Sequence, residues 1–496
     1  ADSAGQDVTT ADTDGAITRT AGTVTGGTVN LNAEEGIAAT TAAGTLNAVN
    51  GATGGAITIT EADDVTLGTV TNAFATGAVS VTTTSGTITT GAVAVTANNG
   101  IITLTANDTS VANASPEGIT VGAGGISSGG GAINLLAADD IALGGDVNAT
   151  AGTVTITADS AGQDVTTADT DGAITDGNGA TNNITAGTVA LTATEDIGAV
   201  ADPLEITVGS FSASGANIYL ANTGGVALAG ITTAGDFSFT ASGSITTTGA
   251  FSVNGNMSLT ATGENDITIS NNITRTNTVA GTLGLVAGRS VIFDSGADVT
   301  GSGAGGVYNV TLNSDSNADG VVGGAIKLGS GTVIASNGGS ITLGGGAAPA
   351  TTAAIGTAAN IDGIRLDGAQ LQSGIGSISL RGAGFAGTSD ARGILFNGDG
   401  VAATGLIQSS SGTISLIGTG GAGANNNGGV VIGNVGPTTG TVTSASGAVT
   451  VTGTAGNSSG INNMGVYIGG GTGVVESTGT ATIGITGHGG SGTGGN

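Results

Sequence analysis

The sequence predicts an all-β protein: an elongated parallel β-solenoid with about three short strands in each coil and no significant helix. The first observation is a short recurring unit of Gly, a small residue, Val or Ile, a polar residue and an aliphatic residue, as in GAITI (55–59) and GAINL (131–135). The second is composition, because 496 residues include 98 Gly, 8 Phe, 3 Tyr and no Trp. A narrow stacked coil needs only small aliphatic side chains inside and Gly at its corners.

Each unit has the pattern of a β-strand. Apolar residues alternate with Thr, Ser, Asn or Ala, and this period of two indicates a strand with one buried face. The units lie at residues 27–31, 55–59, 77–81, 91–95, 131–135, 152–156, 187–191, 235–239, 255–259 and 281–285. Their spacing varies from 14 to 48 residues. Such irregularity favours a solenoid over a sandwich of two sheets, which is the second choice.

The repeat lengthens towards the C-terminus. GSITL (339–343), GSISL (376–380), GTISL (412–416), GAVTV (447–451) and GTATI (479–483) follow one another after 37, 36, 35 and 32 residues. We therefore predict a solenoid with irregular coils of about 20–28 residues over 1–320. Over 321–496 we predict its continuation, with coils of about 35 residues that carry Gly/Asn-rich loops.

The two ends and an internal duplication indicate a larger repeat array. Residues 1–18 recur without change at 158–175, which records a duplication. Neither end shows an atypical capping repeat, although an isolated solenoid needs caps. We expect a fragment or a protomer of a longer repeat protein, with neighbouring repeats or other copies covering its ends.

Charge excludes several functions. The chain has 7 Lys and Arg against 35 Asp and Glu, a formal net charge of −28. Nucleic acid binding requires a basic surface that neutralises phosphates, and anionic membranes repel this charge. No apolar run approaches the ~20 residues that cross a bilayer, so no direct membrane insertion is expected. The absence of Cys excludes disulfides and thiolate metal sites.

Two longer motifs carry a family resemblance. GAINLLAADDI (131–141) and GTVALTATEDI (187–197) share the pattern Gly-x-Val/Ile-x-Leu-x-Ala-x-x-Asp/Glu-Ile. This pattern resembles the repeats of filamentous-haemagglutinin-type exoproteins, which are giant bacterial adhesins exported by two-partner secretion or autotransporter routes. The resemblance implies a secreted, extracellular protein at the bacterial cell surface.

An acidic pair recurs 7 to 9 residues after the Gly of a unit. It occurs as Glu34–Glu35, Asp63–Asp64, Asp139–Asp140 and Glu195–Asp196. Stacked carboxylates about 5–10 Å apart repel each other, and divalent cations relieve that repulsion. Asp139, Asp140, Glu195 and Asp196 are therefore candidates for a cation-binding column. The alternative, which we favour, is a solvated turn in which Asp and Asn cap backbone groups.

A second candidate calcium site has oxygen ligands at alternate positions. Asp315, Asn317 and Asp319 precede Gly320 as in the first half of a calcium loop, but Ile326 occupies the place of the bidentate Glu. Asp12 and Asp14, with their copies Asp169 and Asp171, are weaker versions. A plain Asx turn explains all three segments equally well. Calcium is the only cofactor that the sequence suggests.

Catalysis has little support, and we expect no enzyme. His488 is the only His and has no acidic neighbour in sequence, so a Ser-His-Asp triad is not expected. Polysaccharide-degrading β-helix enzymes need clustered carboxylates or basic residues, and Arg365, Arg381 and Arg392 are the only basic cluster. Thr-x-Thr motifs raise ice binding as a further minor alternative, although outward Thr suits any exposed strand.

These observations predict a structural and adhesive role. We expect an extracellular segment of an acidic bacterial surface, fibre or biofilm-matrix protein that attaches cells to surfaces or to each other. The alternative is a self-polymerising filament or surface-layer subunit, because exposed strand edges are templates for strand addition. Partners would be other copies or neighbouring repeats, joined end to end, and a cell-surface glycan or protein.

Overall fold

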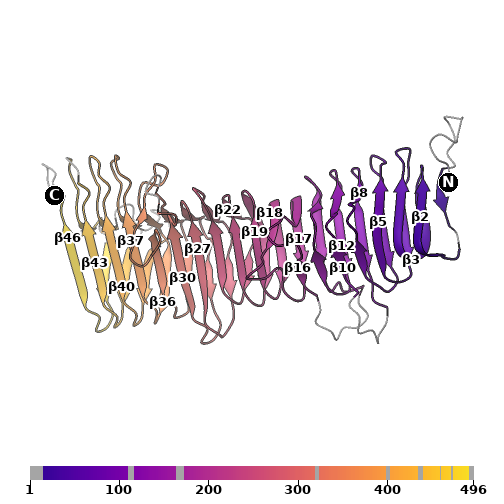
Figure 1. The fold of residues 1–496 in the computed structure, drawn as a ribbon. Helices are drawn as coiled ribbons and strands as arrows, with labels where there is room; N and C mark the ends of the chain where they lie inside the picture. Colours follow the sequence, from indigo (N-terminus) through magenta and orange to yellow (C-terminus); the bar gives the residue numbers. More distant parts are fainter. Residues whose placement is uncertain are drawn as a thin grey trace. The chain divides into compact units, whose positions relative to one another are not determined.

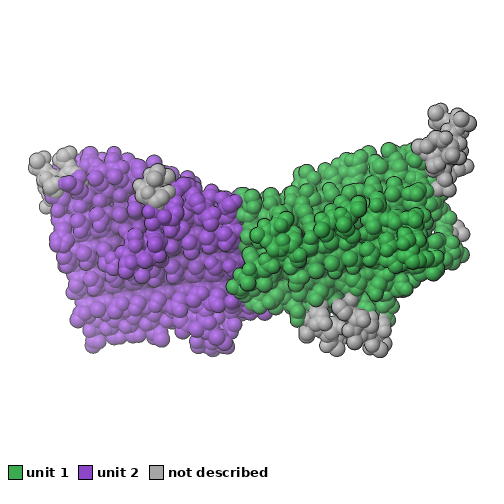
Figure 2. All heavy atoms as spheres, viewed as in Figure 1, with its two compact units in different colours: residues 1–224 green, residues 225–496 purple. Residues whose placement is uncertain are grey.

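The protein is all-β. The computed structural model describes residues 15–19, 21–109, 117–163, 172–318, 323–397, 403–433, 439–457, 460–470 and 473–490. These residues form 46 β-strands and no helix, and consequently no helix that could span a membrane. Contacts divide the chain into two compact units, unit 1 (Ala1–Gly224) and unit 2 (Gly225–Asn496) (Figure 2). The predicted boundary near residue 320 does not coincide with this division and stays a prediction.

The strands of unit 1 are short and follow one another closely. They are β1 (Ile17–Thr18), β2 (Val24–Ala33), β3 (Ile37–Asn50), β4 (Ile57–Glu61), β5 (Val65–Asn72), β6 (Val79–Thr83), β7 (Ile88–Thr90), β8 (Val95–Ala97), β9 (Ile102–Ala106), β10 (Ile119–Val121), β11 (Ile126–Ser128), β12 (Ile133–Ala137), β13 (Ile141–Leu143), β14 (Val147–Asn148), β15 (Thr153–Thr157), β16 (Ile174–Asp176), β17 (Ile184–Thr192), β18 (Leu204–Gly215) and β19 (Ile218–Asn222).

Unit 2 also consists of short strands that follow one another closely. Its strands are β20 (Val226–Thr233), β21 (Phe237–Ala241), β22 (Ile245–Thr247), β23 (Phe251–Val253), β24 (Met257–Ala261), β25 (Ile267–Ile269), β26 (Ile273–Arg275), β27 (Gly281–Ala287), β28 (Val291–Phe293), β29 (Val299–Gly301), β30 (Tyr308–Ser314), β31 (Ile326–Leu328), β32 (Val333–Ala335), β33 (Ile341–Gly345), β34 (Ala354–Ile355), β35 (Ile364–Asp367), β36 (Gln370–Gly374), β37 (Ile378–Ala383), β38 (Ile394–Asn397), β39 (Gly405–Ser409), β40 (Ile414–Thr419), β41 (Val430–Ile432), β42 (Gly440–Ser444), β43 (Val449–Thr454), β44 (Val466–Ile468), β45 (Gly473–Ser477) and β46 (Ile483–His488).

Strand pairing gives three strands per coil. In unit 2, β22, β23 and β24 pair in parallel with β25, β26 and β27 respectively, and the order repeats up to β44, β45 and β46 (Figure 1). Among the described residues from β22 to β46, the extra short strand β34 is the one interruption, and the preceding β20 spans two positions, since it pairs with both β22 and β23. In unit 1, β7, β8 and β9 pair likewise with β10, β11 and β12. The prediction of a parallel β-solenoid with about three strands per coil is confirmed for both units.

Stacked aliphatic side chains form the interior. In unit 2 one column contains Ile341, Ile378, Ile414 and Val449, which occupy equivalent positions in successive coils and are at most 1% exposed. The polar residues between them face outwards, as the alternation predicts. Each buried Val, Leu or Ile side chain contributes about 1.5–3 kcal/mol. The interior therefore repeats the same packing from coil to coil.

The register corrects two parts of the repeat assignment. Val449 pairs with Ile483, so Ala481, and not Gly479, takes the place of Gly447. In unit 1 the early motifs belong to different faces, because Val29 of the first motif pairs with Leu46, whereas Ile57 of the second pairs with Ile37. The five-residue motif is too short to distinguish one face of a coil from another.

Candidate functional site

Three of the four acidic pairs lie at one corner of unit 1. Each of Asp64, Asp140 and Asp196 comes directly before a residue of one stacked column. The residues of this column are Val65, Ile88, Ile119, Ile141, Ile174 and Ile197. Glu34–Glu35 instead precedes Ile37, which stacks between Ile17 and Ile57. Glu34–Glu35 therefore lies at a different corner from the other three pairs.

The second carboxylate of each pair at this corner caps the next coil. The Asp64, Asp140 and Asp196 Oδ1 atoms accept hydrogen bonds of 2.8, 2.8 and 3.0 Å from the backbone N–H groups of Thr87, Ala173 and Asn217. Unit 2 has the same kind of bond, since the Ser290 backbone N–H donates to Asp266 Oδ1 at 2.9 Å. These bonds resemble a helix N-cap, but they join residues more than twenty positions apart. They hold successive coils in register.

The acidic column is not continuous. Ala173 lies in the coil between Asp140 and Asp196, so the two carboxylates are two strand spacings apart, about 10 Å. The Asp139 side chain is buried and accepts a hydrogen bond from the Glu117 backbone N–H. Among the described residues, no three His, Cys, Asp or Glu side chains gather where they could hold a metal ion. The geometry favours capping, and cation binding by Asp139, Asp140, Glu195 and Asp196 stays a prediction.

The second calcium candidate lies in a turn of unit 2. Asp315 is buried with φ 49°, and its carbonyl accepts a hydrogen bond of 2.9 Å from the Ala318 backbone. The exposed Asn317 amide donates 2.7 Å to Glu264 Oε1. Asp319 lies outside the described residues, as do Asp12, Asp14, Asp169 and Asp171. The bond from Ala318 closes a β-turn through the Asp315 backbone, and the Asx-turn interpretation and the calcium prediction both stay untested.

A ladder of buried serines was not predicted. Ser336 and Ser373 donate hydrogen bonds of 2.5 and 2.6 Å to the carbonyl groups of Gly339 and Gly376, three residues further on. Ser409 donates to the same Gly376 carbonyl at 3.0 Å from the following coil. The sequence carries a signal for this ladder, namely a Ser three residues before the Gly that begins a unit. Buried hydroxyls satisfy corner carbonyls that no strand partner reaches.

The basic cluster is only partly assembled. Arg365 and Arg392 both face the buried Asp362, at 3.6 and 3.7 Å, whereas Arg381 Nε donates instead to the Ala350 carbonyl at 2.7 Å. Burial raises the pKa of Asp362, and the Arg392 backbone N–H and both arginines oppose this shift. His488 is exposed on β46. Asp362 was missed because it is 30 residues from Arg392 in sequence.

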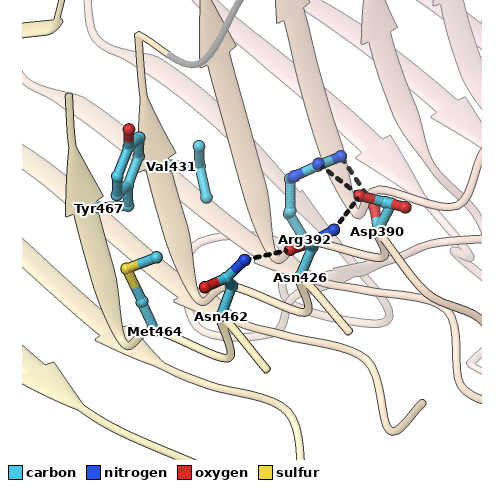
Figure 3. Close-up of a pocket in the computed structure, with 8 residues that line it drawn as sticks. Asp390, Arg392, Asn426, Val431, Asn462, Met464 and Tyr467 are labelled. Atoms are coloured by element: carbon cyan, nitrogen blue, oxygen red, sulfur yellow. Dashed lines mark hydrogen bonds and ion pairs between the residues drawn. The ribbon is translucent and has the colours of Figure 1, made fainter. Parts of the chain in front are cut away.

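A groove lies beside the Gly/Asn-rich loops of unit 2 (Figure 3). One wall is a ladder of Asp390, Asn426 and Asn462, in which the Asn426 amide donates to Asp390 Oδ1 at 3.1 Å and the Asn462 amide donates to Asn426 Oδ1 at 3.2 Å. All three adopt left-handed conformations with φ 63, 58 and 60°. Asp and Asn tolerate this region better than other non-Gly residues, which explains their recurrence in each loop.

The remaining walls combine a charged pair with apolar groups. Arg392 donates a hydrogen bond of 3.0 Å to Asp390 Oδ1, which fixes the guanidinium at one end of the ladder. Figure 3 shows Val431, Met464 and Tyr467 on the other side of the groove. The hollow has a volume of about 380 Å³, within the range of small-molecule sites. It combines fixed hydrogen-bonding groups with an aromatic ring.

The described residues define a repeat protein of the parallel β-solenoid class. Residues 215–285 match the model of a family described as repeats of unknown function, DUF5649. No curated protein and no solved structure matches the chain. The family match supports the repeat assignment, and the resemblance to haemagglutinin-type adhesins stays a prediction.

Proposed function

We propose that the chain is a structural and adhesive segment of an extracellular bacterial surface, fibre or biofilm-matrix protein. The observation that supports this proposal is the continuous parallel register within each unit, reinforced at the corners by Asp and Ser ladders. Because every coil is bonded to the next one, each unit resists bending and local opening. A stiff element of this kind is suited to present contact surfaces to other cells or to a matrix.

Surface composition also supports the proposal. Charged residues make up only 8% of the chain, so the outward positions carry mainly Thr, Ser, Asn and Gly. Such a surface offers many neutral hydrogen-bonding groups and holds ligands without strong salt dependence. The net charge of −28 keeps copies apart in solution.

Surface display tests adhesion directly. The chain would be displayed on a non-adhesive bacterial host, and attachment of the cells to each other, to glass and to polysaccharide-coated wells would be counted. We expect a gain of attachment over a host that displays an unrelated solenoid of similar size. If attachment equals that of the control host on every surface, the adhesive proposal is wrong.

Filament formation is the second candidate, and one observation favours it. Ile483 and Ile485 of β46 are 41 and 47% exposed, although their partners Val449 and Val451 are fully buried. A further coil, from the same chain or from another copy, would cover them and pair with β46. Negative-stain microscopy over a concentration series tests this alternative. Filaments that lengthen with concentration would support it, and single particles at all concentrations would contradict it.

A further inference from the structure

Three hollows border one column of unit 2, and the groove beside Tyr467 is separate from the other two, because the intervening Leu395 is 3% exposed and lines none of them. Register places one residue from each of six consecutive coils in this column: Ile292, Lys327, Arg365, Leu395, Val431 and Tyr467. The groove of about 380 Å³ borders its Tyr467 end. Hollows of about 360 and 280 Å³ both border Lys327 and Arg365. Five strand spacings separate Ile292 from Tyr467, so the column is roughly 24 Å long.

The column has two kinds of hydrogen-bonding group beside apolar side chains. At the Tyr467 end, amide and carboxylate groups of the Asn462, Asn426 and Asp390 ladder face an aromatic ring. At the other end, Arg365 Nε donates 2.7 Å to Asp367 Oδ2, next to Ile292 and Phe293. A ligand of the groove beside Tyr467 needs hydroxyl or amide groups on its edges and an apolar C–H face (Figure 3).

Charge along the column is nearly balanced, although the whole chain is strongly acidic. Its cations are Lys327, Arg365 and Arg392, and the acidic groups beside them are Asp294, Asp362, Asp367 and Asp390. Both arginines are held in ion pairs with these carboxylates. A highly charged ligand would find no matching excess of opposite charge. Hydroxyl groups can donate to the carboxylates and accept from the guanidinium groups.

A peptide suits this surface less well. Peptides that extend a sheet need an unpaired strand edge. β35, β38 and β41 do not offer one, because each is paired on both sides. β44, which carries Tyr467, has a described partner on one side only, so a peptide that adds to its edge is the alternative that the test must separate.

We propose that the groove beside Tyr467 binds a sugar ring of a neutral polysaccharide, with the ring against Tyr467 and its hydroxyl groups on the Asp390, Asn426 and Asn462 ladder (Figure 3). A pyranose ring has the required chemistry, with hydroxyl groups at its edge and C–H groups on its faces. The inference names the ligand of the proposed adhesive function and rests on that proposal for its biological meaning.

Affinity electrophoresis in gels that contain a soluble polysaccharide tests the site. The probes are a mixed-linkage β-glucan, a mannan and a galactan, with alginate as the acidic comparison. We expect at least one neutral polymer to retard the chain. Tyr467→Ala should weaken that interaction at least tenfold, and Tyr467→Phe should retain it because the ring remains. Tyr219→Ala, which removes an outward tyrosine of unit 1, is the matched control and should behave as wild type.

Several outcomes would overturn the site. In the first, no neutral polymer retards the chain. In the second, wild type and Tyr467→Ala are retarded equally. In the third, alginate retards the chain more strongly than the neutral polymers do, and salt abolishes the effect. Asn426→Ala provides an independent check on the polar wall and should also weaken binding, provided that its thermal midpoint matches wild type. If only peptides from a displayed library bind at Tyr467, the site exists but the ligand class is wrong.

Repeating the attachment assay with Tyr467→Ala separates the two proposals. Attachment that persists after polysaccharide binding is lost would leave the adhesive function standing and would overturn this groove as its cause. Polysaccharide binding without any attachment would overturn the adhesive function and leave the site standing. Loss of both together in Tyr467→Ala supports both.

Discussion

Thr41 and Glu61 share a hydrogen bond of 2.6 Å in the interior of unit 1, where both side chains are fully buried. The Glu61 carboxylate also accepts hydrogen bonds of 2.9 and 3.0 Å from the backbone N–H groups of Ala43 and Ala62. One carboxylate thus serves three donors, of which the Ala62 N–H also donates to the Thr41 carbonyl at 2.9 Å. Buried charges persist in proteins when they are hydrogen-bonded in this way.

Replacing this carboxylate should destabilise unit 1. We expect Glu61→Ala to lower the free energy of unfolding by about 3–5 kcal/mol, because it removes the acceptor of the buried Thr41 hydroxyl and of the Ala43 N–H. Glu61→Gln should cost less, since an amide can still accept from the two backbone N–H groups. Urea unfolding followed by circular dichroism measures both. Glu35→Ala, at a half-buried corner, is the control, and an equal loss in that variant would contradict the argument.

The Asp140 cap should be visible at a single amide. Asp140→Ala removes the acceptor of the Ala173 N–H, and a hydrogen bond to a charged group is worth about 1.5–3 kcal/mol. We therefore expect hydrogen exchange at Ala173 to accelerate by about tenfold or more. Asp140→Asn keeps an oxygen acceptor and should retain most of the protection. Unchanged exchange in Asp140→Ala would show that the bond does not protect the corner.

Chelation should leave unit 1 unaffected. The Asp140 and Asp196 carboxylates already accept backbone hydrogen bonds and lie two coils apart. We expect the thermal midpoint to be the same in excess EDTA and in millimolar calcium. A midpoint several degrees higher in calcium, and lost in Asp140→Asn, would instead establish the cation column.

Stability should depend on pH through Asp362. Burial raises the pKa of this carboxyl, so the folded state binds its proton more tightly than the unfolded state. Its contribution to stability is greatest below its ordinary pKa of 3.8 and decreases as the pH rises through the raised value. Because an amide does not ionise, the Asp362→Asn variant does not lose this contribution to stability as the pH rises. We expect its thermal midpoint relative to wild type to increase as the pH is raised from about 4, whereas a constant difference would contradict the assignment.

Two glycines of β27 should differ in their tolerance of a methyl group. A Cβ atom at Gly281 would lie 2.7 Å from the Arg275 Nε atom, whereas one at Gly284 would meet no atom within 4 Å. Arg275 is 2% exposed and lies over the Tyr308 ring, so it cannot move freely. We expect Gly281→Ala to cost about 1–3 kcal/mol and Gly284→Ala to be nearly neutral in urea unfolding. Equal effects would mean that Arg275 yields without cost.

Local patterning predicts the strands but not their place in a coil. Alternation identifies Ile341, Ile378, Ile414 and Val449 as buried, because a period of two has one physical cause in any strand. The duplicated segments show the limit. Their identical Ile-Thr pairs lie in different columns, since Ile17 pairs with Ile37 and Ile174 pairs with Ile141. The neighbouring coil, rather than the segment itself, decides the column.

The candidate sites show the same limit. The capping role of Asp140 follows from residue type and turn position, so the sequence contains it. The meeting of Asp362 with Arg392, and of Asp390 with Asn426 and Asn462, depends on the lengths of intervening loops. The length of a loop tells which residues of neighbouring coils meet only when the strand register is already known. The charge balance around the Arg365 and Arg392 ion pairs therefore could not be predicted from the sequence.

The Asp and Ser ladders have a consequence for how such a chain changes length over generations. Each bond joins a coil only to its immediate neighbour, so removing or copying one whole coil leaves every remaining bond with an equivalent partner. Recombination between repeats can then lengthen or shorten the array without a new core. The two identical stretches at 1–18 and 158–175 record a duplication that did not keep this register, because Ile17 and Ile174 lie in different columns. Duplication of whole coils alters reach and the number of contact sites, while the chemistry of each coil is inherited intact.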